Sequence, residues 1–400
     1  MRFLALGGDE QAPVHENGVE LQGAWLVGSL NLATTKTPYA LYLNYCRIEK
    51  IEAIHSELAV LGLDGSCLQA GLDAGGLRCG GGVYLRGGFH ALDTVNLVGA
   101  TIGGDLDCDD ATFEHPGGLA LACSRAKVEG MFLLGSTKIV GEVNLNGMRV
   151  SALRDDEGSW EGAQGKLWLD GFTYLRFDGH APTDARTRIA WLSKQVPEHV
   201  GKDFRTQPWE QLTMVLRAMG HSNAARKVAI EKQEQFRAAG KVPRMNWPFH
   251  WLYGKLTGYG YEPVRLTVVL LMAWIVASLV YWAAVNPARF GSSTHLLTSS
   301  KATPDPVCVA IRARAGDFTP CEPIMPKYQE LFAPAYALDV LLPVISLGSK
   351  ADWKARLTGD NHEPLYWGWA LQFFTWALAF VGWVSGLMLV VVLGGLVKKD

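Results

Sequence analysis

The sequence predicts a mixed fold, with a right-handed parallel β-solenoid, a short α-helical neck and two transmembrane helices. Apolar residues two apart recur about every five residues between residue 20 and about residue 175. The pattern then becomes that of amphipathic helices, and two charge-free runs follow at 266–285 and 364–397. We therefore divide the 400 residues into a cytoplasmic solenoid (1–180), a helical hairpin neck (181–243), a juxtamembrane interfacial segment (244–265), a first transmembrane helix (266–286), an external loop (287–363) and a second transmembrane helix with a basic tail (364–400).

The solenoid prediction depends on short strands punctuated by small residues. In "VNLVGATIGG", Val95 with Leu97 and Ala100 with Ile102 form two apolar pairs, and we expect Leu97 and Ile102 to point inward. Short strands and turns of fixed period build a stack of coils, in which each coil buries its apolar face on its neighbours. A β-sandwich, the alternative, would have longer strands and turn signals every 8–12 residues or so. "GATIGG" and "DATF" resemble the motif of pentapeptide-repeat solenoids, and their loosened spacing implies coils that are not uniform.

The neck begins where the period lengthens, in "DARTRIAWLSKQ" and "PWEQLTMVLRAMGHSNAARKVAIEKQEQFRAAGK". Pro208 suits a first helical turn, Gly220 a helix end, and Ser222 or Asn223 the cap of the next helix. The inward positions are predicted to be Leu212, Val215, Leu216 and Met219 in the first helix and Ala225, Val228 and Ala229 in the second. The pair resembles one tetratricopeptide-type hairpin. A single hairpin cannot bury its own face, so we expect it to pack on the solenoid end or on another chain.

The first charge-free run is about as long as a helix needs to cross a bilayer, and the second is longer. Basic residues precede the first run and follow the second, which favours cytoplasmic termini and an external segment between the runs. In an oxidising space, Cys308 and Cys321 of that segment would form a disulfide. The five other cysteines, Cys46, Cys67, Cys79, Cys108 and Cys123, alternate with apolar residues and are expected to be core residues.

Aromatic residues precede the first run and lie at the start of the second, and we expect them to anchor the protein at the lipid bilayer surface: Trp247, Trp251, Tyr259, Tyr261, Trp367 and Trp369. Within the second run, Gly382 and Gly386 form G-x-x-x-G. Small residues four apart let another backbone approach closely, either the first span or a second subunit. A homo-oligomer is therefore possible.

Two features bear on a channel. "LTGYGYEP" is similar to a potassium-channel filter, but it precedes the first span, so we expect a juxtamembrane turn. The apolar segment 336–348 lies between the spans and is too short to cross. It either enters the membrane or packs on its outer surface. Asp339 within it is a candidate polar site, or it caps a local turn or pairs with Lys350 or Lys354.

Signals for catalysis and for nucleic-acid binding are missing from the sequence. No Rossmann, P-loop, nucleophile-elbow, zinc-protease or C-x-x-C motif occurs, so we expect no catalytic residue, no cofactor and no metal ligand set. "CDDATFEH" groups three acids and a histidine, which indicates solvated corners or a weak cation site. The net charge of -2 does not favour a nucleic-acid partner.

The order of the segments resembles a group of bacterial inner-membrane proteins that are often labelled membrane-associated oxidoreductases. The similarity rests on "LDGFTY", "QPWEQLTMVLRAMGH", "LYGKLTGYGYEP" and "YALDVLLPVISLG", and covers nearly the whole chain. It implies a multi-pass protein of the bacterial cytoplasmic membrane. From the residues we expect a non-catalytic module that presents its solenoid to an unknown cytoplasmic protein partner or senses a signal. The alternatives are an oligomeric pore with a re-entrant segment near 336–348, and the oxidoreductase of the family label.

Overall fold

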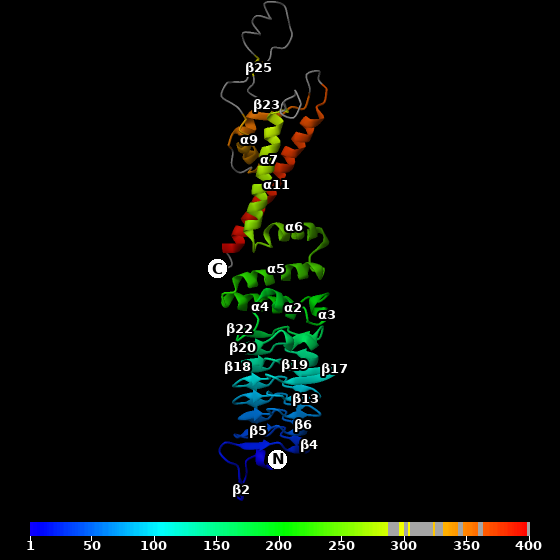
Figure 1. Ribbon diagram of the computed structural model, residues 1–400, viewed down its shortest axis with the longest axis vertical. Helices are drawn as coiled ribbons and strands as arrows, with labels where there is room; N and C mark the ends of the chain where they lie inside the picture. The colour runs from blue at the N-terminus through cyan, green and yellow to red at the C-terminus, as the bar shows by residue number, and fades with distance from the viewer. Residues whose placement is uncertain are drawn as a thin grey trace, which may run out of the picture. The chain divides into compact units, whose positions relative to one another are not determined.

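The computed structural model describes residues 1–286, 296–299, 303–304, 323–324, 331–342, 347–358 and 363–397. The chain forms two compact units, residues 1–247 and 248–400. The first unit contains a parallel β-solenoid of about seven turns (Figure 1). Leu41 pairs with Leu61, twenty residues later, whereas Leu106 pairs with Phe132, twenty-six residues later. The coils are therefore unequal in length, as the loosened repeats predicted.

Each coil contributes strands to two parallel sheets. The first sheet contains β3 (Val19–Gln22), β5 (Ala40–Asn44), β7 (Glu57–Leu58), β8 (Val60–Gly62), β11 (Arg78–Cys79), β12 (Val83–Tyr84), β15 (Thr101–Ile102), β16 (Leu106–Asp107), β18 (Lys127–Leu134), β20 (Arg149–Asp155) and β22 (Thr173–Phe177). The second contains β4 (Trp25–Asn31), β6 (Arg47–Glu52), β9 (Cys67–Leu68), β10 (Leu72–Asp73), β13 (His90–Ala91), β14 (Val95–Asn96), β17 (Thr112–Ala122), β19 (Lys138–Asn144) and β21 (Leu167–Trp168). Before them lie α1 (Arg2–Ala5) and a small hairpin of β1 (Gly8–Asp9) and β2 (Ala12–Pro13).

The core runs along the inside of the stack. Leu97 and Ile102 are fully buried, which confirms the inward assignment made from the two-apart apolar pairs. Successive coils approach so closely that some corners exclude a side chain. A Cβ on Gly103 would lie 2.3 Å from the carbonyl oxygen of Gly80, and one on Gly71 would lie 2.3 Å from that of Thr94. Glycine is required at such points because neighbouring backbones touch.

Helices cover the last coil. They are η1 (Gly158–Ala163), α2 (Ala185–Leu192), α3 (Pro197–Val200), α4 (Gln207–Ala218) and α5 (Ser222–Ala238). As predicted, α4 has Pro208 in its first turn. Of the predicted inward residues, Met219 packs against the solenoid core, Ala229 is buried, and the others join that core: Leu212, Val215, Leu216, Ala225 and Val228. The cap was predicted wrongly, because α5 begins at Ser222 and His221 occupies the N-cap position without a side-chain bond. The hairpin therefore buries its apolar face on the solenoid end (Figure 1).

The second unit is helical. After η2 (Arg244–Asn246), it contains α6 (Trp247–Thr257), α7 (Pro263–Val285), α9 (Ala333–Leu341), α10 (Ser349–Asp352) and α11 (Tyr366–Val397). Two short strand pairs accompany them, β23 (Leu297–Ser299) with β26 (Trp353–Ala355) and β24 (Thr303–Pro304) with β25 (Pro323–Ile324). Within the described ranges, α7 and the Tyr366–Val390 part of α11 are the helices long and apolar enough to cross a membrane. "LTGYGYEP" forms the turn between α6 and α7, as expected.

Candidate functional site

A groove of about 830 Å³ lies where the outer face of the solenoid meets α4. Strands β18, β20 and β22 supply one wall with residues 127–129, 149–151 and 173–175. Helix α4 supplies the other wall with Gln211, Met214, Val215 and Ala218. Two large apolar side chains in it are open to solvent, since Leu175 is 75% exposed and Met214 is 59% exposed. The groove therefore offers an apolar contact surface at the side of the stack.

Two basic residues lie in the same groove. Lys127 and Arg149 face each other in register on the paired strands β18 and β20, and both are exposed. Adjacent strands lie about 4.8 Å apart, so two like charges are stacked directly. In the described part of the chain no ion pair is recorded for either residue, and Glu129 is the acid that shares the groove. The groove thus combines an apolar wall with two cations that form no ion pair with a described residue.

The position of α4 follows from the hydrogen bonds that it makes with the last coil. The side chain of Gln211 donates to the carbonyl oxygen of Tyr174 at 2.6 Å, and that of Gln207 donates to the carbonyl oxygen of Phe172 at 3.2 Å. Gln207 also accepts the Gly171 N–H at 2.8 Å. These amides replace the next strand that the edge of β22 lacks, because buried backbone groups need partners. Helix α4 is therefore fixed against β22, and the groove has a rigid wall.

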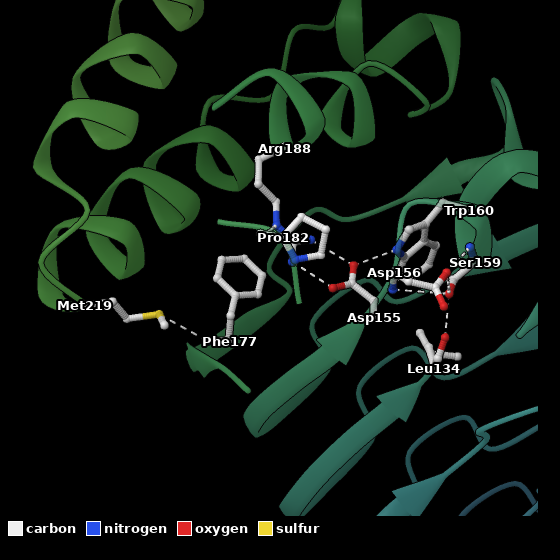
Figure 2. A network of polar contacts seen from close by, with 9 residues as sticks. All are labelled: Leu134, Asp155, Asp156, Ser159, Trp160, Phe177, Pro182, Arg188 and Met219. Carbon is white, nitrogen blue, oxygen red and sulfur yellow. Dashed lines mark hydrogen bonds and ion pairs between the residues drawn. The ribbon is translucent and has the colours of Figure 1, made fainter. Parts of the chain in front are cut away.

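A buried ion pair fixes α2 to the same coil (Figure 2). Asp155 ends β20 and Arg188 lies on α2, and each side chain is 1% exposed. The guanidinium donates to both carboxylate oxygens, at 2.7 and 2.8 Å, and Trp160 donates its indole N–H to the same carboxylate at 2.7 Å. Charges buried this deeply require paired, hydrogen-bonded partners. We call these three side chains the latch.

Further contacts hold Arg188 from its other sides. Its Nε donates to the carbonyl oxygen of Pro182 at 2.6 Å, and its Cζ lies 3.7 Å from the centre of the Phe177 ring (Figure 2). Sequence analysis missed the latch. Asp155 and Arg188 are 33 residues apart and belong to different element types, so no local pattern signals their pairing.

The acidic group predicted from "CDDATFEH" does not form a shared site. Asp109 pairs with Arg154 and accepts the Gly135 N–H, whereas Glu114 contacts His90 and His115 contacts Asp93. The Asp109–Arg154 pair joins coils two apart, and the other contacts join neighbouring coils. The described residues contain no cluster of three or more metal-ligating side chains.

The solenoid cysteines behave as the sequence suggested. Cys46, Cys79, Cys108 and Cys123 are buried and Cys67 is half-buried. Burial raises the pKa of the Cys79 thiol to about 11 and that of Cys123 to about 12, because a thiolate is poorly solvated in an apolar core. Cys308 and Cys321, with the disulfide predicted between them, lie outside the described residues.

The segment predicted as 336–348 is helix α9 (Ala333–Leu341) over part of its length, and 343–346 lie outside the described residues. Helix α9 packs beside α7. The Trp274 indole donates to the carbonyl oxygen of Pro334 at 2.9 Å, and the rings of Tyr281 and Tyr336 meet edge to face. Trp274 lies near the middle of α7, so α9 runs alongside its second half.

Asp339 has a local role. Its carboxylate is buried and accepts the backbone N–H groups of Leu347 at 2.9 Å and Lys350 at 2.7 Å. Of the alternatives open from sequence, the structure shows the capped turn. A carboxylate that accepts two amide N–H groups is well satisfied, which accounts for an acid in an apolar segment.

The two glycines of G-x-x-x-G lie in different surroundings. Gly382 is buried on the α11 face that carries Leu371, Thr375, Leu378 and Ser385. On that face Thr375 accepts a hydrogen bond from Tyr281 of α7 at 3.0 Å. Gly386 is exposed, and a Cβ there would meet nothing within 4 Å. Within one chain, packing therefore involves Gly382 but not Gly386.

The predicted anchors are mostly exposed. Trp247, Trp251, Trp367 and Trp369 are open to their surroundings and Tyr261 is half-buried. Tyr259 differs because it folds back on α6, where its ring contacts His250 and Tyr253. Its left-handed backbone, with φ of 56°, directs it there between Gly258 and Gly260. We therefore correct Tyr259 from a membrane anchor to a packing residue of the turn.

Comparison of the chain with protein-family models, with curated proteins and with solved structures finds no match.

Proposed function

We propose that the chain is a non-catalytic, membrane-anchored interaction module whose solenoid groove binds a segment of a protein partner. The observation that carries this proposal is the stacked pair Lys127 and Arg149 beside the exposed Leu175 and Met214. Like charges placed in register cost stability unless something neutralises them. A partner segment with acidic and apolar side chains would neutralise the pair and cover the apolar wall.

We propose that α7 and α11 span the bacterial inner membrane, with both termini in the cytoplasm. Most of the apolar surface of each helix is exposed, unlike that of a core helix in a soluble protein. The charge bias of the flanking sequences supports the orientation. A membrane-impermeant thiol reagent, applied to reduced spheroplasts, should label Cys308 and Cys321 but not the half-buried Cys67. Labelling of Cys67 alone would invert the orientation.

A photo-crosslinking experiment tests the groove. A photoreactive amino acid is placed at Leu175 or Met214 in the full chain, in cells, and at Lys138 on the other sheet as a matched exposed control. We expect a discrete protein adduct from the two groove positions and none from position 138. The adduct should disappear when Lys127 and Arg149 are both changed to Glu. Equal adducts at all three positions, or an adduct that survives charge reversal, would exclude the groove as the docking site.

An oligomeric pore is a second candidate, favoured by one observation. Helix α9 lies beside the second half of α7, as a re-entrant segment would if α7 crosses the membrane. The full chain in liposomes should then conduct ions, and conduction should respond to substitutions in α9. Absence of flux from such liposomes would leave the interaction module as the supported function.

A further inference from the structure

The outermost strands at the two ends of the solenoid differ in their hydrogen-bond partners. At the end near α4, other parts of the chain form the backbone hydrogen bonds that a further coil would make with the last strands. Val196 donates its N–H to the carbonyl oxygen of Leu167 at 3.1 Å, and Gln207 and Gln211 serve the strand after it. At the other end, β4 pairs with β6 and β3 pairs with β5, and the described residues show no second partner for either strand. The first coil therefore has open strand edges.

The same end carries exposed apolar side chains. Eight large hydrophobic residues are exposed among the described residues of the stretch 1–180. Five of them belong to α1, the turn after it and β4: Phe3, Leu4, Leu6, Trp25 and Val27. Trp25 is 69% exposed and Val27 is 81% exposed. Terminal coils of repeat proteins normally present a polar outer face to water, and this one does not.

Strand β4 is suited to pair with another strand. Its seven residues, "WLVGSLN", contain no charge and no proline, which are the usual features that protect an edge strand. Strand β3 carries Glu20, so pairing of β3 with a copy of itself would place like charges together. Arg47 of the next coil lies over Trp25, with its Cζ 5.2 Å from the ring centre.

We infer that two copies of this chain associate through β4, edge to edge and antiparallel, with the apolar side chains of α1 beside the junction. A two-fold axis makes one strand pair with its own copy in the antiparallel sense. A charge-free strand meets no repulsion when it does so, which favours a second copy over a charged partner. The pairing would satisfy the open backbone groups of β4 and remove Trp25 and Val27 from water.

The test uses the full chain in detergent, with its protein mass measured by light scattering over a range of concentrations. We expect a dimer for the unmodified chain. Val27→Lys places like charges together across the two-fold axis and should raise the dimer dissociation constant by at least about a hundredfold. Leu92→Lys is the matched control, since Leu92 is an exposed apolar residue of the stack (44% exposed) outside both the first coil and the groove, and it should leave the dimer unchanged.

Mixing two oppositely charged variants distinguishes a loss of strand pairing from misfolding. Val27→Glu alone should also be monomeric, and an equimolar mixture of the Lys and Glu variants should form mixed dimers. Thermal unfolding of each variant at low concentration checks the fold. A monomeric unmodified chain would refute the inference, as would a dimer that persists in Val27→Lys or that the mixture does not restore. Persistence would place any dimer contact elsewhere, for instance at the exposed Gly386.

Discussion

Replacing Arg188 by methionine tests the latch most directly. The change keeps most of the side-chain volume but removes both hydrogen bonds to Asp155 and the contact with Phe177. It leaves a carboxylate that is 1% exposed, with Trp160 as its remaining recorded donor. Breaking a buried pair by removing one partner costs about 3–5 kcal/mol. We expect that loss to appear locally, in β20, β22 and α2.

The double variant provides the internal check. Asp155→Asn keeps an acceptor for the Trp160 indole but removes the charge. Combined with Arg188→Met it should cost about 1–3 kcal/mol less than the sum of the two single changes, because no charge is then left buried. Arg154→Met is the matched surface control, since Arg154 also lies on β20 but pairs with a partly exposed Asp109. Such pairs are worth about 0–1 kcal/mol.

Native-state hydrogen exchange of the full chain measures these changes segment by segment, which avoids treating two units as one unfolding transition. Peptides from residues 149–192 should lose protection in Arg188→Met and keep it in Arg154→Met. If Arg188→Met lowers the free energy of local unfolding by less than about 1 kcal/mol, the reasoning is refuted. Breaking this buried ion pair would then not cost the expected 3–5 kcal/mol or so, an order-of-magnitude figure of about that size for such pairs. Fully additive single changes would show that the two side chains act independently.

Three other outcomes are expected. Leu97→Ala should reduce the stability of the stack by about 2–5 kcal/mol and raise hydrogen exchange in the coils on both sides, and a change confined to one coil would contradict the shared core. At pH 8, Cys108 and Cys123 should react with a thiol reagent far more slowly than Cys67, because their raised pKa keeps them protonated; equal rates measured by mass spectrometry would show an open core. Asp339→Ala should increase exchange at residues 347–350 without preventing membrane insertion, and unchanged exchange would exclude its capping role.

Periodicity predicted the elements well because burial in a repeated coil depends on local spacing. The inward positions of Leu97 and Ile102 follow from two-residue alternation, and the apolar stripe of α4 follows from helical spacing. The latch could not be predicted, because Asp155 and Arg188 meet only after α2 folds back on the last coil. The groove depends on the register of three coils and on one helix, so its lining is not contiguous in sequence. The apolar segment predicted at 336–348 begins inside α9 (Ala333–Leu341), since Ala333 and Pro334 are not strongly apolar.

The proposed partner rests on the column of side chains that contains Lys127 and Arg149. Register places Glu57, Arg78, Thr101, Lys127, Arg149 and Thr173 one above another on successive coils. In the early coils the charges alternate, and Arg78 lies 3.7 Å from Glu57, which also pairs with Lys36. In the later coils the same column stacks two cations beside an apolar wall. Electrostatic pairing within the column would favour an acid at position 127 or position 149. The described residues form no ion pair with the second cation, which supports the proposal that an acidic partner segment binds in the groove.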